Sequence, residues 1–250
     1  MLNQTRLAPS LALVVLVLTH CQSPTSYSPT EFEELRDASE AHLAYERGDC
    51  ESVARMSSPK RLQTWQPNEY HHSMLLLRAF CQDIAGDGKA ARSSYEDLIQ
   101  IAPDSFAGHD ARERLRILII EQNDPDGARW LRESRKRAMA AQSNRSSRVP
   151  VERRLAFFPP VPRAAGIEGY AVVEFGVTPQ GQTSNPVVVE SSPRFLFDGA
   201  SIRAVREWQY TRSADSDRQV IKLLFRRAEA TGDALEIVDP SPGFEAEPTP

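Results

Sequence analysis

The placement of proline constrains this chain more than any other sequence feature. The chain has 250 residues and 18 prolines, which gather at Pro24–Pro29, Pro150–Pro162 and Pro240–Pro250. Proline removes a backbone donor and clashes with the preceding helical turn, so such clusters mark joints and tails. The clusters exclude one continuous helical bundle, and the length then fits two small domains better than one large domain.

The charge balance argues against nucleic acid as a partner. The 30 Lys and Arg residues nearly cancel the 34 Asp and Glu residues, which leaves a formal net charge of −4. Nucleic-acid-binding domains carry a strongly basic surface, and this chain has no bulk excess of positive charge. Hydrophobic residues make up 40% of the chain, which is enough for a folded core.

The N-terminal segment has the pattern of an export signal. The apolar run Leu7–Leu18 is shorter than the roughly 20 residues that a membrane-spanning helix needs, so residues 1–20 predict a cleaved signal peptide. Leu18 stands three places before Cys21, which resembles the lipobox of bacterial lipoproteins. That resemblance implies a lipid on Cys21, a tether at residues 21–30 and anchoring to the outer membrane from the periplasm. Two alternatives stay open: Cys21 as an ordinary residue, and an uncleaved segment that anchors the chain in the inner membrane.

Residues 31–142 have a helical pattern that contains a repeat. Glu31–Arg47 and Tyr70–Ala85 are both followed by a Gly-Asp pair, which is a signal for the end of a helix. The spacing of the second unit resembles a tetratricopeptide repeat, a helical hairpin of about 34 residues. That resemblance implies a small solenoid whose concave surface binds a partner, and a simple spacer is the alternative interpretation.

Cys50 and Cys81 predict a disulfide. If Cys21 carries a lipid, these two thiols are the remaining cysteines of an exported protein, and an oxidising compartment favours their pairing. A metal pair is a rival interpretation, although the spacing matches no short metal-ligand motif, and two inert buried thiols are another. A short solenoid has a small core, which a disulfide between its early helices would stabilise.

Residues 158–228 change from a helical to a strand period. Apolar residues alternate through Tyr170–Thr178, and Gln182–Glu190 returns as the second strand of a hairpin. A helical period then runs to Trp208, and alternation resumes in Gln219–Arg227. The expected fold class is therefore α+β, with N-terminal helical hairpin repeats followed by a small ββαβ domain.

Two other segments are set apart by their composition. Residues 143–157 are rich in Arg and Ser and predict a basic linker. Residues 231–250 contain five acidic residues, four prolines and no Lys or Arg. A segment of this kind buries too little apolar surface to offset the entropy of ordering, so residues 229–250 predict a disordered acidic tail.

The segment from about Pro159 to Arg227 resembles the C-terminal domain of the TonB family. The resemblance rests on a proline-rich start, a Gly before the first strand, a hairpin Gly, a Ser-Ser pair, a Phe-Asp helix start and an Ala-Val-x-x-Trp-x-aromatic signature. In this chain these features are Pro160–Ala165, Gly169, Gly181, Ser191–Ser192, Phe197–Asp198 and Ala204–Tyr210. Within this pattern we expect structural roles for Gly169, Gly181, Trp208 and Tyr210.

The resemblance implies binding rather than catalysis. TonB-like domains lie in the periplasm and pair an extended segment of an outer-membrane transporter with a sheet edge, whose unpaired backbone groups the segment satisfies. The expected partners are envelope proteins, TonB-dependent transporters among them. The predicted partner-binding residues lie in the proline motif and in the last strand: Pro160, Val161, Pro162, Gln219, Val220, Ile221, Lys222, Leu223, Leu224, Phe225 and Arg226.

Departures from the family pattern keep a second function open. A helical region stands where the family has a long Pro-Lys and Pro-Glu spacer. The alternative is a lipid-anchored tetratricopeptide scaffold of an envelope complex without energy transduction. In this alternative the helical repeats bind the partner, and the ββαβ unit only oligomerises, for example as a homodimer, or caps the repeats. Catalysis is not expected, because residues 143–250 contain no His and no Cys and therefore no imidazole base or thiol nucleophile. We expect no cofactor and no metal.

Overall fold

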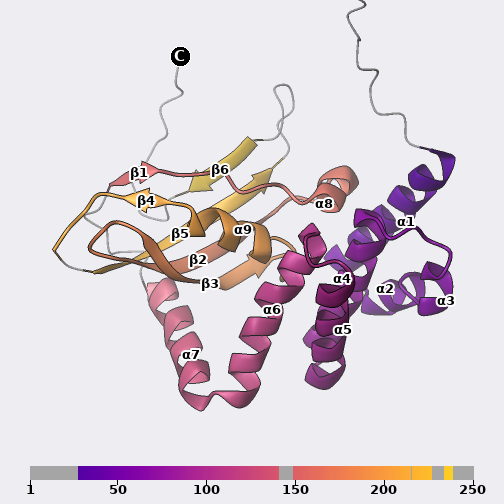
Figure 1. The fold of residues 1–250 in the computed structure, drawn as a ribbon, viewed down its shortest axis with the longest axis horizontal. Coiled ribbons are helices and arrows are strands. Elements are labelled where there is room, and N and C mark those ends of the chain that lie inside the picture. The colour runs from indigo at the N-terminus through magenta and orange to yellow at the C-terminus, as the bar shows by residue number, and fades with distance from the viewer. Residues whose placement is uncertain (1–27, 141–148, 215, 227–233, 239–250) are drawn as a thin grey trace, which may run out of the picture.

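The computed structural model describes residues 28–140, 149–214, 216–226 and 234–238. In this part of the chain a helical region and an antiparallel sheet lie side by side, which confirms the α+β class (Figure 1). The helical region comprises α1 (Pro29–Glu46), α2 (Cys50–Met56), α3 (Pro59–Leu62), α4 (Glu69–Ile84), α5 (Gly88–Ile101), α6 (Phe106–Asn123) and α7 (Pro125–Ala140).

The predicted signal peptide and Cys21 lie outside the described residues. Within the ranges described above, no helix combines the length and the apolar character needed to cross a membrane.

Each Gly-Asp pair ends one helix and begins the next. Gly48 and Gly86 have φ angles of 76° and 81°, in the left-handed region that glycine adopts most easily. The side chains of Asp49 and Asp87 then accept a hydrogen bond from the backbone N–H three residues further on, which caps the following helix. The chain therefore forms the helical hairpins α1–α2 and α4–α5. Their assignment as tetratricopeptide repeats stays a prediction.

The predicted disulfide between Cys50 and Cys81 is confirmed. The first cysteine opens α2 and the second lies in α4, with their Cα atoms 5.5 Å apart. The bond ties α2 to the helix that also contacts α1, α5 and α6. A disulfide at this place rules out the metal-pair interpretation of these two residues.

The sheet is built on the predicted ββαβ unit, which consists of β2 (Gly169–Val177), β3 (Thr183–Ser192), α9 (Asp198–Arg206) and β5 (Asp217–Arg226). Strand β2 pairs antiparallel with β3 on one side and with β5 on the other. A short pair of strands, β1 (Pro150–Glu152) and β4 (Gln209–Tyr210), forms a second sheet, and α8 (Pro160–Ala165) precedes β2. The inner face of the main sheet packs against α9.

A further strand, β6 (Ala234–Val238), continues the sheet beyond β5 and gives the strand order β3-β2-β5-β6. It pairs antiparallel with residues 222–226. Strand β6 therefore covers part of the β5 edge on which we expect a partner, and residues 234–238 of the predicted disordered tail form a strand. The rest of that tail lies outside the described residues. The strand is only five residues long, and the acidic, proline-rich composition around it conceals its β-forming Ile and Val.

The helical region and the sheet pack directly against each other. Helix α8 contacts α1 and α4, α6 contacts α9, and α7 contacts β3. Phe80 of α4 packs against Phe195 with ring centroids 5.5 Å apart, and Phe106 of α6 stacks on Phe157 at 4.6 Å. The predicted linker at residues 143–157 thus contributes β1 and Phe157 to the folded structure, so the two parts form a joined unit.

Candidate partner-binding site

Strand β5 carries most of the predicted partner-binding residues. Ile221, Leu223 and Phe225 are at most 2% exposed and face the core, as their alternation predicts. On the opposite face, the amine of Lys222 lies 3.7 Å from the ring centroid of Tyr170. The side chains therefore hold β5 in the sheet, and its backbone edge is the part that is able to pair with another chain.

The two edges of β5 differ. Strand β2 pairs with residues 217–225 along almost the whole of one edge. On the other edge, β6 pairs with residues 222–226 and ends opposite Lys222. The outer edge of β5 thus accepts an antiparallel strand, and the chain itself supplies one over about half of the edge.

Trp208 and Tyr210 lie behind this sheet. The indole N–H of Trp208 donates a hydrogen bond to the carbonyl oxygen of Arg154 at 2.8 Å, and the residue is 1% exposed. The ring centroid of Phe175 lies 6.1 Å from that of Trp208, which it meets edge-on. It lies 5.9 Å from the ring centroid of Tyr210, which is tilted relative to it. Both residues therefore support β2 from the core side and offer no surface to a partner.

Close backbone approaches explain two glycines of the family pattern. A Cβ atom on Gly169 would lie 2.1 Å from the carbonyl oxygen of Ser192. At Gly181, where φ is 88°, it would lie 2.1 Å from the carbonyl oxygen of Tyr210. No larger side chain fits at either position without a shift of the backbone.

The proline motif lies where the sheet-containing part of the chain meets the helical region. Val161 is 1% exposed and Pro162 is buried, because α8 packs against α1 and α4. Pro160, Val161 and Pro162 line a cavity of about 30 Å³ together with His42 of α1. The chain's own helices thus cover Val161 and Pro162, whereas Pro160 is half-buried. A contact of this motif with a partner stays a prediction.

A pair of salt bridges joins α6 to α9. Asp110 pairs with Arg203 at 2.7 Å, and Glu113 accepts two hydrogen bonds from Arg206 at 2.5 and 2.9 Å. A Cβ atom on Gly199 would lie 1.9 Å from the carboxylate of Asp110, so the two helices cross closely. Sequence reasoning missed this joint, although each helix carries its two charges at the same spacing of three residues.

Asp198 lies beside this joint and has a buried oxygen without a partner. Its Oδ1 atom is closed to solvent and accepts no hydrogen bond within the described structure. Burial, with a smaller contribution from nearby Asp110, raises the pKa of Asp198 to about 6, although a hydrogen bond with Ser191 and the charges of Arg114 and Arg194 oppose the shift. An ionised Asp198 therefore destabilises the folded state at neutral pH.

Replacing Asp198 by asparagine should stabilise the protein at pH 7.5 by about 1 to 3 kcal/mol, because one pKa unit corresponds to about 1.4 kcal/mol. Between the unfolded pKa of 3.8 and the folded pKa of about 6, the folded state binds more protons than the unfolded state, so stability falls as the pH rises through this window. The gain of Asp198→Asn should therefore vanish near pH 4. Urea denaturation of both proteins at the two pH values measures it.

Asp110→Asn is the matched control for this prediction. Asp110 also has a pKa raised by burial to about 6, but it holds Arg203 in an ion pair, so its neutralisation should give no stabilisation at pH 7.5. Equal effects of Asp198→Asn on stability at pH 4 and at pH 7.5 would show that the ionised carboxylate of Asp198 does not destabilise the folded state as expected.

Comparison with known proteins identifies the sheet-containing part of the chain. Residues 155–223 match the model of the family described as Gram-negative bacterial TonB protein C-terminal. Protein TonB of Escherichia coli (strain K12) is 30% identical over 69 residues, which cover 28% of this chain and 29% of that protein. The solution NMR structure of the Pseudomonas aeruginosa TonB CTD is 25% identical and covers 35% of this chain and 94% of that chain, with a TM-score of 0.31.

The matched range contains α8, β2, β3, α9 and most of β5, which is the ββαβ unit with its preceding proline motif. The chain spans only 29% of the length of the Escherichia coli relative, and the family model covers residues 155–223 and none of α1 to α7. Residues 155–223 of this chain are therefore similar to the C-terminal domain of TonB proteins.

Proposed function

We propose that this protein is a TonB-like interaction module of the bacterial envelope, which binds an extended segment of a partner protein by strand addition to β5. The observation that carries the proposal is that the outer edge of β5 holds β6 in an antiparallel ladder. Main-chain hydrogen bonds of this kind supply affinity for any extended segment that reaches the edge. The matched family is a protein-interaction family, and we assign no catalytic role to this chain.

Strand β6 competes with a partner segment for the outer edge of β5. It pairs with residues 222–226, whereas a partner strand along Asp217–Arg226 would pair with about twice as many residues. The covalent connection of β6 to β5 gives it an effective concentration that is in the millimolar range for short linkers. A partner therefore replaces β6 when its longer ladder outweighs this advantage, so β6 favours long or high-affinity partner segments.

The proposal extends to the location and to the partner. The similarity to Protein TonB supports a periplasmic location and partners among envelope proteins, including TonB-dependent outer-membrane transporters. We include the lipid on Cys21 in this proposal. Cells fed a fatty-acid analogue should label the wild type and not Cys21→Ser, and an unlabelled wild type would rule the anchor out.

The scaffold alternative has less support. Helix α8 packs against α1 and α4, so the chain itself covers part of the surface of these two helices. This packing favours a role for the helical region as the support of the TonB-like domain over a role as an independent binding surface.

The test uses the chain's own strand as the probe. A synthetic peptide of residues 232–239 should bind a protein that ends at residue 230, since its β5 edge is open, and should bind the full chain at least tenfold more weakly. A protein that ends at residue 239 keeps β6 and serves as the matched truncation. Titration calorimetry measures the three affinities.

Methylation of peptide backbone nitrogens distinguishes strand addition from side-chain docking. The N–H groups of alternate residues in a strand point to the same side. One peptide N-methylated at residues 235 and 237, and another at residue 236, should therefore differ strongly, with only one retaining affinity. If both bind as well as the unmodified peptide, or if the unmodified peptide ignores the truncated protein, the proposed site is wrong.

A further inference from the structure

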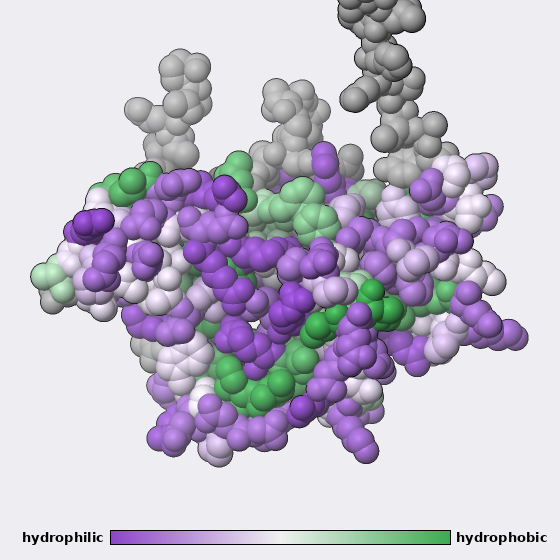
Figure 2. Space-filling model, in the orientation of Figure 1, coloured by the Kyte–Doolittle hydropathy of each residue, from purple (hydrophilic) through white to green (hydrophobic). Residues whose placement is uncertain are grey.

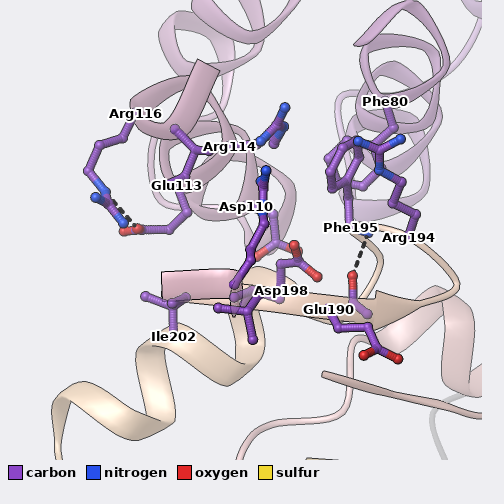
Figure 3. A pocket seen from close by; sticks show the side chains of 15 residues that line it. Phe80, Asp110, Glu113, Arg114, Arg116, Glu190, Arg194, Phe195, Asp198 and Ile202 are labelled. Atoms are coloured by element: carbon purple, nitrogen blue, oxygen red, sulfur yellow. Dashed lines mark hydrogen bonds and ion pairs between the residues drawn. The ribbon is translucent and has the colours of Figure 1, made fainter. Parts of the chain in front are cut away.

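A cavity of about 260 Å³ lies where the helical region meets the TonB-like domain. Its walls come from α4, α6, α7, β3, α9 and the segment between β3 and α9, and Figure 3 shows their side chains around it. In Figure 2 apolar surface lies between α6 and α7, bordered by hydrophilic residues. The volume lies below the roughly 300 to 1,000 Å³ of typical small-molecule sites, so it suits one large side chain. The apolar lining comprises Phe80, Ile117, Val188, Val189, Phe195 and Ile202.

One arginine at this cavity has no carboxylate partner in the described part of the chain. Arg114, Arg116 and Arg135 pair with acidic residues of the helices. Arg194 is exposed, and its guanidinium lies 4.7 Å from the ring centroid of Phe195. Arg194 is therefore the cation at the cavity that is available to a ligand.

No carboxylate of the lining forms an ion pair with Arg194 in the described part of the chain, although the charge of Arg194 lowers the pKa of Asp198. Asp110 and Glu113 form ion pairs with arginines of α9. Glu190 accepts a hydrogen bond from the hydroxyl of Tyr170, and Figure 3 shows its carboxylate pointing away from the other labelled side chains. The oxygen of Asp198 that lacks a partner is closed to solvent. The cavity thus favours a ligand with an apolar body and a negative charge.

Phe195, whose ring lines the cavity next to Arg194, has a strained backbone conformation. Phe195 has a φ of 67°, a region that a bulky residue rarely occupies. Its N–H donates to the hydroxyl oxygen of Ser191 at 3.1 Å, and its ring lies 4.3 Å from the guanidinium of Arg114. Strain of this kind persists where the surroundings enforce it and clusters at ligand sites. Here it presents the Phe195 ring and the adjacent Arg194 to the cavity.

The cavity also borders an outer edge of the sheet. Among the described strands, β3 pairs only with β2, and its four consecutive residues Val188–Ser191 line the cavity. Helix α6 reaches this strand through Arg116, whose guanidinium donates a hydrogen bond to the carbonyl oxygen of Pro186 in β3 at 3.4 Å. An edge strand offers regularly spaced donors and acceptors to an extended chain.

We propose that this cavity binds an extended segment of a partner protein that carries a large apolar residue and, two positions later, a carboxylate. The segment lies along the outer edge of β3, its apolar side chain enters the cavity, and its carboxylate pairs with Arg194. Alternate residues of an extended chain share one face, and guanidinium and carboxylate groups form strong paired hydrogen bonds. Because β3 and β6 lie at opposite ends of the sheet, this site is separate from the strand addition proposed for β5.

The probe is a blocked hexapeptide of threonines with one leucine and, two residues later, one glutamate, studied with the full chain. Backbone NMR titration should shift the amides of Val188–Ser191. Arg194→Gln should weaken binding at least fivefold. The same peptide with glutamine in place of glutamate, the glutamine peptide, should bind the wild type as weakly as the glutamate peptide binds Arg194→Gln. The glutamine peptide should bind Arg194→Gln no more weakly than it binds the wild type. Arg212→Gln, an exposed arginine outside the cavity, is the matched control and should leave the affinity unchanged.

A third peptide, with alanine in place of leucine, tests the cavity without altering the protein and should bind at least fivefold more weakly. The proposal fails if the glutamate and glutamine peptides bind the wild type equally, or if Arg194→Gln and Arg212→Gln behave alike. It also fails if the shifts occur only at Lys222–Arg226, which would assign the peptide to the β5 edge, or if no peptide binds at millimolar concentration.

Discussion

Replacement of Trp208 by alanine is expected to lower the free energy of unfolding by about 3 to 5 kcal/mol, the usual range for a buried Trp. The indole is 1% exposed and packs edge-on against Phe175. The guanidinium of Arg153 lies 5.1 Å from the centroid of the Trp208 ring. The indole N–H of Trp208 donates a hydrogen bond to the carbonyl oxygen of Arg154. Alanine would leave a cavity behind β2 and remove the donor from this carbonyl. Urea denaturation of the full chain measures the loss.

Two variants separate packing from hydrogen bonding. Trp208→Phe keeps most of the apolar contact and loses the N–H, so we expect a smaller loss, about 1 to 3 kcal/mol. Trp130→Ala makes the same truncation at a half-buried position of α7 and should cost about 1 kcal/mol. Equal losses for Trp208→Ala and Trp130→Ala would mean that Trp208 is not a central support of the domain.

The ββαβ unit was predictable because its signals are local. Alternating apolar residues mark the strands, and a change of period marks α9 between them. The same alternation correctly places Ile221, Leu223 and Phe225 in the core. The Gly-Asp pairs are equally local, since the glycine ends one helix and the aspartate caps the next within the same two residues.

The contacts between distant segments were not predictable from such signals. An apolar Pro-Val-Pro motif suits either a partner or the chain's own helices, and only the structure shows the packing of α8 against α1 and α4. The ion pairs of Asp110 with Arg203 and of Glu113 with Arg206 each join residues 93 positions apart. No periodicity within one helix encodes such a pairing.

The candidate site also combines features that the sequence pattern indicates with features that depend on contacts between distant segments. The family resemblance led us to predict β5 as the strand that takes a partner, and this stays a proposal. The sequence did not predict β6, since five residues are too few for a period to stand out within an acidic segment. The sequence pattern also did not indicate the cavity beside β3, whose other walls come from α4, α6, α7, α9 and the segment around Phe195.

Replacement of both Cys50 and Cys81 by serine is expected to cost about 3 to 4 kcal/mol, because the bond closes a loop of 31 residues in the unfolded chain. Helix α2 depends on this bond more than its neighbours do. It has seven residues, and Val53 is its single buried side chain, so little apolar burial holds it against α4. Denaturation of the oxidised protein and of the double variant measures the loss.

The effect should spread from α2 through α4, which contacts α1, α2, α5 and α6 and also touches α8. Hydrogen exchange in the double variant should therefore rise first in α2, then at the ends of α1 and α4, and least in β2 and β5. Cys21→Ser leaves the bond between Cys50 and Cys81 intact, so it should leave the free energy of unfolding unchanged. If the double variant instead exchanges faster in the sheet than in α2, the disulfide stabilises the joint between the two parts of the chain and not the early helices.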